Sequence, residues 1–488
     1  MLGSKKKKIL KPNKDWFSDQ LRDGPLNGHR EPIKDYFASF NLHNKLKVHY
    51  TEDPDLIFKL LGDAADENPP SNRLSLSHYD NALSNLSQPI SLLLGENQRQ
   101  HDLWRILAKA LSISTGDSSE NLLHNPLDRL DIKPIEELTK IRCKEVLSRL
   151  STKRQFDLIW DFGYLIPYYI GLEITGIRPL KENSSLIKIF SFIRRFVFSK
   201  GFGRIRFWDG NRSADSFLVW TAAMFGQIFG NPGSLNKILY NGAGWGAKNF
   251  YRVIEASFAQ EEEIENYSLI KRIQNIQSEF TSQNSGANFS EKEYKDMSTC
   301  ILLEVMTSFH ILTGSSFGYI LEVLLQEDYS LENFVQDLKT AHEKDEAENS
   351  TTNTDYLINK VLSKKSTTEM VYRIARQSFP KYNIKAGDHV CFRIREASKY
   401  INPDKEKWLT FGPHEKCPYT LSESGERKYP SDSTQKALHP CFGQFWARSI
   451  LKTMFLELFD ELPDIKIINK NIKEVGIPLS VIAKTRGK

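Results

Sequence analysis

The chain has 488 residues, of which 40% are apolar and 26% are charged, and its formal net charge is +5. These values are ordinary for a globular protein. The segment KKKKILKPNK (5–14) contains six lysines, more than the whole charge excess, so the rest of the chain is close to neutral. This balance argues against a nucleic-acid-binding body, which would need a basic face. We interpret residues 1–30 as a basic flexible tail and 31–488 as one domain.

The cysteine pattern favours a reducing compartment. The chain has five cysteines, an odd number, scattered along the sequence and without a CxxC pair: Cys143, Cys300, Cys391, Cys417 and Cys441. A disulfide framework is therefore not expected, and no zinc-ligand spacing is present. The first residues are too polar for a secretory signal, and the longest apolar stretch (164–177) is too short for a membrane span. We expect a soluble, cytoplasmic protein without a transmembrane anchor.

The periodicity of apolar residues predicts a mainly α-helical fold with small β-sheets. The central prediction is a helix from about Glu291 to Leu325, which begins with capping signals and is apolar nearly all round, as expected for a helix that crosses the core. The other predicted elements, in chain order, are a strand at 46–52, helices at 99–112, 135–150, 156–176, 185–199 and 214–230, a polar loop at 341–354, a helix at 355–365, strands at 369–377 and 382–394, an irregular stretch at 395–436, a helix at 445–462 and an edge strand at 476–483.

Residues 437–448, ALHPCFGQFWAR, place a cysteine immediately before the last long helix. Cys441 could be a buried structural residue, a catalytic thiol or an iron ligand. A helix N-terminus stabilises a thiolate. Pro440 fixes the approach of the chain, and Gly443 permits close contact with a flat ligand. These features are what an axial iron ligand requires, because its sulfur must be held by backbone amides and shielded from water.

This segment resembles the haem-ligand segment of the cytochrome P-450 superfamily, Phe-Gly-x-Gly-x-His/Arg-x-Cys-x-Gly followed by Ala-Arg. The chain matches it at His439, Cys441, Gly443, Ala447 and Arg448, and departs from it at the early Phe and Gly positions, where Thr434, Gln435 and Ala437 stand. The resemblance implies a single-domain P-450-like fold, with haem b (iron protoporphyrin IX) as cofactor, Cys441 as iron ligand, and His439 and Gly443 at the cofactor.

Further segments resemble the same superfamily in the same order. In residues 91–111, His101 and Arg105 stand where a His-x-x-x-Arg motif opens a helix, so both can face one haem propionate. Residues 156–177 resemble an Asp-rich helix bent by proline. In residues 370–394, Arg373 matches the arginine that approaches the other propionate. The long apolar helix occupies the place of the superfamily's central helix, which crosses over the haem.

Two departures concern retention of the cofactor and its chemistry. The Glu-x-x-Arg of the superfamily falls on Val361 and Lys364, so its buried salt bridge is missing or replaced by other groups. The acid–alcohol pair of the central helix falls within SFHILT (308–313), with Ile311 and Leu312 in its place. His310 and Thr313 are the nearby polar candidates for catalysis. Family branches without the pair use peroxide or rearrange a hydroperoxide.

Two functions follow from the resemblance. The first is a haem-thiolate oxidoreductase that acts on a lipophilic small molecule, with a ferredoxin or reductase as partner if dioxygen is the oxidant and with no such partner if a peroxide is used. Residues around 79–95, 185–230 and 305–316 would line its pocket. The alternative is a haem-free scaffold of the same fold that docks a partner or carrier protein.

Overall fold

The computed structural model describes the chain in segments. The described residues are 38–42, 46–57, 60, 74–75, 103, 106–107, 109–110, 132–153, 155–178, 217, 249–259, 268–281, 289–326, 330–348, 352–368, 371–400, 420–421, 427–428, 443–468 and 481–484. The predicted tail (1–30) and the predicted helix at 185–199 lie outside them, and the predicted helix at 214–230 is described only at Phe217.

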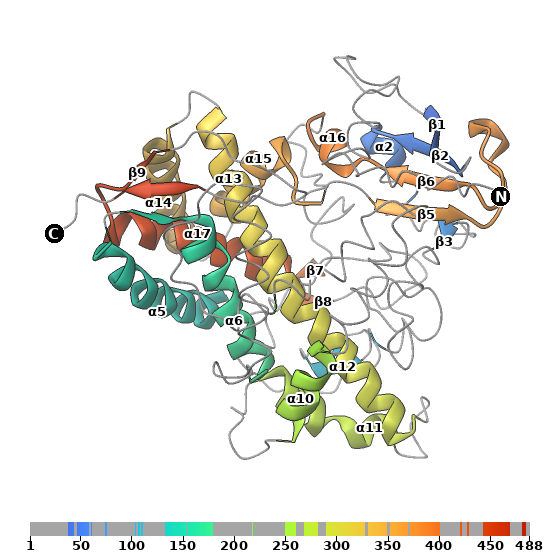
Figure 1. Ribbon diagram of the computed structural model, residues 1–488, viewed down its shortest axis with the longest axis horizontal. Helices are drawn as coiled ribbons and strands as arrows, with labels where there is room; N and C mark the ends of the chain where they lie inside the picture. Colours follow the sequence, from blue (N-terminus) through green and yellow to red (C-terminus); the bar gives the residue numbers. More distant parts are fainter. Residues whose placement is uncertain are drawn as a thin grey trace, which may run out of the picture.

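One continuous helix, Glu291–Gln326, crosses the molecule, as the sequence predicts (Figure 1). Its parts are α12 (Glu291–Thr307), the π-helical turn η5 (Ser308–Thr313) and α13 (Gly314–Gln326). Ser290 and Glu293 form a capping box at its start. The helix is long and apolar enough to cross a membrane by length and composition alone, but 83% of its most apolar window is buried inside the protein. It is therefore the core helix of the fold.

Helices pack around this central helix on one side of the molecule. Their bounds are α5 (Ile132–Ser151), α6 (Leu165–Thr175), α10 (Leu269–Asn275), α11 (Gln277–Thr281), α14 (Leu331–Glu348), α15 (Thr352–Lys364) and α17 (Gln444–Glu461). Phe455 of α17 links three helices, because its ring lies 4.7 Å from that of Phe317 on α13 and 5.3 Å from that of Phe334 on α14. Such aromatic pairs add to the burial of apolar area that holds the helices together.

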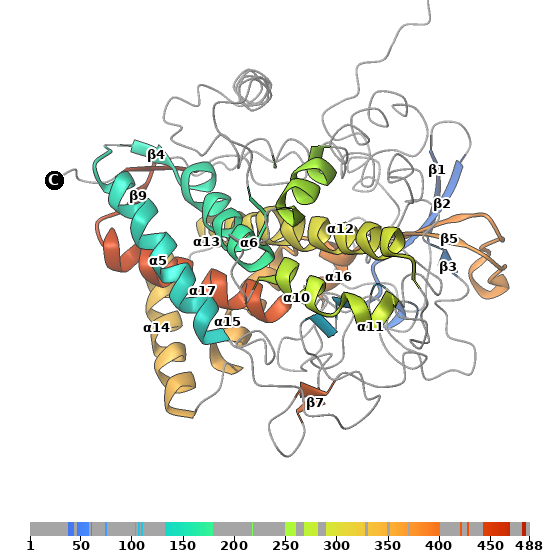
Figure 2. The same ribbon diagram turned by 90° about the horizontal axis from the view of Figure 1, so that it is seen from below.

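A five-stranded sheet stands at the other side of the central helix (Figures 1 and 2). Its order is β1-β2-β6-β5-β3. The strands are β1 (Ala38–Leu42), β2 (Leu46–Thr51), β3 (Leu74–Ser75), β5 (Val371–Ala375) and β6 (His389–Phe392). Strands β5 and β6 form an antiparallel hairpin in which Arg373 pairs with Val390. Two short helices cover this region, α2 (Pro54–Ile57) and α16 (Ile394–Ser398).

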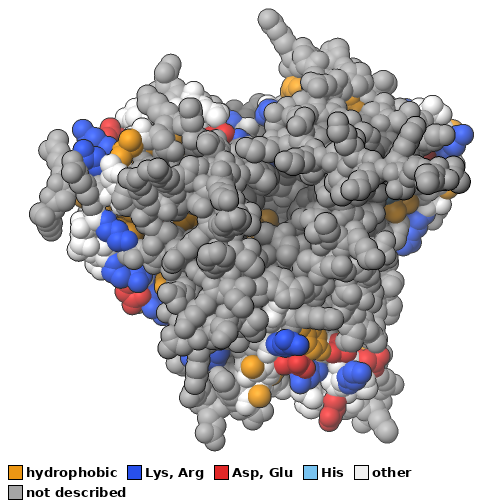
Figure 3. Space-filling view, viewed as in Figure 1, with side chains coloured by type: hydrophobic (Ala, Val, Ile, Leu, Met, Phe, Trp, Pro, Cys, Tyr) orange, Lys and Arg blue, Asp and Glu red, His pale blue; other side chains and the backbone are white. Residues whose placement is uncertain are grey.

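Two smaller sheets complete the described structure. One has the order β4-β10-β9, and the other consists of β7 and β8. Their bounds are β4 (Gln155–Asp157), β7 (Thr420–Leu421), β8 (Arg427–Lys428), β9 (Lys466–Ile467) and β10 (Ile482–Lys484). On the face shown in Figure 3, described basic and acidic side chains are intermixed at the lower end of the molecule, over α11 and the start of α12.

Three sequence predictions need correction. Residues 341–348 belong to α14 and are not a loop, because Ala, Glu and Lys favour a helix and Asp345 is held by residues 353 and 354. The predicted helix at 156–176 begins as strand β4 and the π-helical turn η3 (Ile159–Gly163), because Asp157 pairs with Ile482. The C-terminal strand β10 lies between β4 and β9, so it is central and not an edge.

Candidate functional site

A narrow face of the central helix borders open space in the middle of the fold. From Asp296 to Leu324 every side chain is buried except those of Val305, Ser308 and Leu312. These three residues follow the spacing of one helix face. Leu312 is 37% exposed although its neighbours in the central helix are buried. We call these three residues the open face of the central helix.

The π-helical turn η5 sets the direction of this face. The turn comprises Ser308–Thr313, the same six residues that the resemblance to the cytochrome P-450 superfamily predicts beside the iron. The Thr313 hydroxyl donates a hydrogen bond to the Ser308 carbonyl at 3.4 Å, so it is used within the turn itself. Single π-helical turns inside α-helices are frequent at functional sites.

The His310 side chain packs against α6 and is not part of the open face. Its ring centroid is 5.2 Å from that of Tyr168 and 6.3 Å from that of Tyr164. Burial lowers the pKa of His310 to about 3, so the imidazole is neutral at physiological pH. His310 Nδ1 has no hydrogen-bond partner. The catalytic roles predicted for His310 and Thr313 stay predictions, and the surroundings of both side chains favour a structural role.

Helix α17 begins beside the π-helical turn. Its N-cap is Gly443, where a Cβ would meet nothing within 4 Å, so open space also adjoins this end. The Trp446 ring stacks on the ring of Phe309 in the π-helical turn, with centroids 5.5 Å apart and planes 16° apart. The start of α17 is thus held close to the π-helical turn, which contributes Ser308 and Leu312 to the open face.

Four predicted site residues lie outside the described part of the chain: His101, Arg105, His439 and Cys441. Three of them, His101, Arg105 and Cys441, have described neighbours close in sequence. Around His101 and Arg105, the residues Leu103, Ile106 and Leu107 are helical and buried in the core, which agrees with the predicted amphipathic helix. Cys441 stands two positions before the N-cap of α17, so the positive end of that helix dipole is available to a thiolate there.

Arg373 on β5 is buried, with 9% of its surface exposed. A buried guanidinium is costly unless an anion or hydrogen-bond acceptors compensate it, and its planar fork suits a carboxylate. On α15, Val361 is buried among apolar residues and Lys364 is exposed. Neither can form the missing Glu-x-x-Arg pair. A different buried ion pair lies next to them, between Lys365 and Glu322 of α13.

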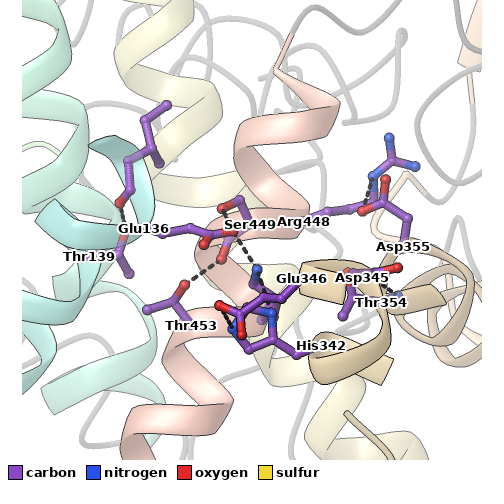
Figure 4. A network of polar contacts seen from close by, with 12 residues as sticks. Glu136, Thr139, His342, Asp345, Glu346, Thr354, Asp355, Arg448, Ser449 and Thr453 are labelled. Carbon is purple, nitrogen blue, oxygen red and sulfur yellow. Dashed lines mark hydrogen bonds and ion pairs between the residues drawn. The ribbon is translucent and has the colours of Figure 1, made fainter. Parts of the chain in front are cut away.

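A network of polar contacts joins α17 to the helices α5 and α15 (Figure 4). Glu136 of α5 accepts hydrogen bonds from Ser449, at 2.9 Å, and from Lys452. Arg448 forms an ion pair with Asp355 of α15 at 3.3 Å. These contacts hold α17, the helix that follows Cys441 in the sequence, in place. They join residues far apart in the sequence, and no local pattern indicates them.

Asp345 of α14 anchors the start of α15 in the same network. Its carboxylate accepts hydrogen bonds from the backbone amides of Asn353 and Thr354, both at 2.9 Å, and from their side chains at 2.8 and 2.7 Å. Burial alone would raise the pKa of Asp345, but these four hydrogen bonds outweigh it and lower the pKa below its ordinary value.

No family model matches the sequence, and no curated protein matches it. The fold, in contrast, matches many solved structures. Cytochrome P-450 PksS of the Bacillus subtilis 168 bacillaene polyketide synthase shares 16% identity, with 93% of this chain and 94% of that chain covered, at a TM-score of 0.58. CYP109E1 from Bacillus megaterium, in complex with testosterone, shares 12% identity over 97% and 100% of the two chains at a TM-score of 0.60.

P-450 BioI, in complex with an acyl carrier protein that carries hexadec-9Z-enoic acid, shares 14% identity over 97% and 99% of the chains at a TM-score of 0.59. The chain has a cytochrome P-450 fold. The mainly helical architecture with small sheets, predicted from the sequence, is thereby confirmed.

The cytochrome P-450 fold implies a haem cofactor, and the described residues fit one. Leu312 of the central helix is partly exposed, and a Cβ at Gly443 of α17 would meet nothing within 4 Å, so both positions leave room for a group. The indole Nε1 of Trp446 is buried and has no hydrogen-bond partner, so a polar atom near the start of α17 is unmatched. Arg373 adds a buried cation suited to a carboxylate. A buried cation of this kind fits a haem, which carries two propionates, and the thiol predicted for the iron, Cys441, lies outside the described residues.

Proposed function

We propose that this protein is a haem-thiolate oxidoreductase of cytochrome P-450 type that acts on a lipophilic small molecule. The observation that carries the proposal is the open face of the central helix, in and beside a π-helical turn on which Trp446 at the start of α17 stacks. A fold alone does not define a function, so the proposed activity rests on this site. The open face contributes two apolar side chains and one hydroxyl, which suits a ligand that is mostly hydrocarbon.

The residues predicted to bind the cofactor would each have a role in holding it. Cys441 would provide the thiolate ligand of the iron, and the N-terminus of α17 would stabilise its charge. Arg373, together with His101, Arg105 and His439, would neutralise the propionates. Gly443 leaves room for the ring. When bound, a haem with a thiolate ligand supplies oxidative chemistry that no amino-acid side chain offers.

The side chains on the open face favour a peroxide or a hydroperoxide as oxidant. None of Val305, Ser308 and Leu312 is an acid, and Thr313 donates its hydroxyl to its own helix. A monooxygenase that uses dioxygen needs groups that move protons to the distal side. The described face lacks a carboxylate for that task. If dioxygen is nevertheless used, a ferredoxin or reductase is required as partner.

A second candidate is a haem-free scaffold that docks a partner or carrier protein. The buried Val361 and the exposed Lys364, in place of the Glu-x-x-Arg pair, favour it. One structural neighbour, P-450 BioI, is itself in complex with an acyl carrier protein. A carrier is also compatible with the first candidate, because it could present a lipophilic substrate to the haem.

The ferrous–carbon monoxide spectrum of the purified protein distinguishes the two candidates. A Soret band shifted to long wavelength supports a haem with thiolate ligation, and protein without a Soret band, even after incubation with hemin, supports the scaffold. Turnover with hydroperoxide but none with reductase, ferredoxin and NAD(P)H supports the peroxide route. Turnover only with the electron-transfer proteins and dioxygen contradicts it.

A further inference from the structure

The chain between α15 and β5 is fastened to the central helix. Lys365 forms an ion pair with Glu322 of α13, and its ammonium lies 5.3 Å from the centre of the Tyr319 ring. Two residues further along, the Thr367 hydroxyl lies 2.6 Å from the hydroxyl of Ser316, also on α13. This connection leads directly into β5, the strand that carries Arg373.

The chain that leaves β6 is fastened at the same place. Arg395 of α16 donates a hydrogen bond to the Tyr319 hydroxyl at 2.9 Å, and its guanidinium carbon lies 4.7 Å from the centre of that ring. Its Nε also donates to the Ser366 carbonyl at 2.9 Å, which joins the two chain segments to each other. Both ends of the β5–β6 hairpin therefore meet on Tyr319.

Tyr319, Glu322 and Arg395 are buried and the Lys365 side chain is 17% exposed, so the geometry of the group is restricted. The exposed fractions are 0% for Tyr319, 5% for Glu322 and 8% for Arg395. Coulombic attraction is strong where water is excluded, and a buried ion pair must keep both partners, because one alone leaves an uncompensated charge. A cation over a desolvated aromatic ring adds further attraction. The contacts thus define one arrangement of the hairpin on α13.

We propose that Glu322, Lys365, Tyr319 and Arg395 form an ionic clamp that positions Arg373 relative to the open face of the central helix. The pairing of β5 with β6 fixes Arg373 only within its own sheet. The clamp fixes that sheet against the helix that borders the cofactor space. The clamp residues are positioning residues, and their effect on the cofactor rests on the proposed function, in which Arg373 holds a haem propionate.

The test uses Lys365→Met, Arg373→Met and the double variant, with Asp460→Asn as control because Asp460 forms an exposed ion pair with Lys339 at 2.5 Å. We expect Lys365→Met to lower haem affinity about tenfold, the size typical for a residue that orients a cofactor ligand. In the Arg373→Met background the same substitution should add little, since its effect passes through Arg373. Asp460→Asn should leave affinity unchanged.

If Lys365 had a purely structural role, Lys365→Met would lower haem affinity by the same factor in the wild type and in Arg373→Met. That result would overturn the proposal. The charge-swapped variant Glu322→Lys/Lys365→Glu should recover part of the affinity, whereas failure of the swap together with additive losses contradicts the clamp. Hydrogen exchange at residues 371–375 of the protein without haem provides a separate readout. Faster exchange in Lys365→Met supports the clamp even if the wild type binds no haem, and unchanged exchange contradicts it. Absence of haem in the wild type contradicts the proposed function alone.

Discussion

Replacing Gly314 by alanine tests the π-helical turn on which the open face depends. A Cβ at this position would lie 3.0 Å from Tyr164 Cε1 and 3.1 Å from the Gly163 carbonyl oxygen, and closer still to Tyr164 Cδ1. The ring has little room to move, because Tyr164 is buried, its hydroxyl lies 3.1 Å from Ser315 Oγ, and its ring is 5.1 Å from that of Trp160. The added methyl therefore meets a fixed ring on one side and backbone on the other.

Two effects oppose each other in this substitution. Alanine favours a helix over glycine by about 1 kcal/mol. Overpacking a filled core costs roughly 1–3 kcal/mol, and contact with backbone on one side places this case in the upper part of that range. The net expectation for Gly314→Ala is a loss of about 1–2 kcal/mol in the free energy of unfolding.

Urea unfolding followed by circular dichroism measures this loss. The matched control is Gly443→Ala, where the Cβ would meet nothing within 4 Å. We expect the control to change the free energy of unfolding by less than about 0.5 kcal/mol. If Gly314→Ala is as stable as the wild type, or more stable, the central helix does not pack on α6 as described, and the direction of the open face must be revised.

Three other predictions concern single side chains. Asp345→Ala should lower the free energy of unfolding by roughly 2–4 kcal/mol at neutral pH, because buried donors lose a charged acceptor. Because folding lowers the pKa of Asp345, the stability difference between wild type and variant is complete at pH values above 3.8, the ordinary pKa of an aspartate, and is lost as pH falls through the folded pKa. Urea unfolding at several pH values measures this difference. A difference that stayed constant with pH would contradict the prediction. His310→Phe should keep stability within about 1 kcal/mol, since it removes a nitrogen without a partner, and should keep turnover; a large loss of turnover at unchanged stability would restore a catalytic role. Leu312→Trp should fill the open space and reduce the binding of lipophilic ligands, measured by the iron spin state, without loss of stability; unchanged ligand binding would place the pocket elsewhere.

The sequence predicts the long helices well because their signals are local. The capping residues Ser290 and Glu293 and the apolar run behind them fix the central helix. Helices in polar segments are harder to predict from the sequence. Residues 341–348 contain no apolar pattern, and their helix depends partly on the contact of Asp345 with Thr354. Strand β4 is determined by its partner Ile482, which lies far away in the sequence.

The site is only partly readable from the sequence. The resemblance predicts residues 308–313 beside the cofactor, but a 3.6-residue period does not reveal a π-helical turn or show that Leu312 is exposed. The ionic clamp joins Glu322, Lys365 and Arg395, which stand in three separate elements. No spacing rule connects them, so only the folded structure brings them together.

The central claim is that Cys441 ligates a haem iron. Its most direct test is the ferrous–carbon monoxide spectrum, recorded together with porphyrin content, of the wild type, Cys441→Ser and Cys417→Ser. The account predicts a long-wavelength Soret band in the wild type and in Cys417→Ser, and loss of that band in Cys441→Ser. A Cys441→Ser variant with the spectrum and porphyrin content of the wild type would contradict it.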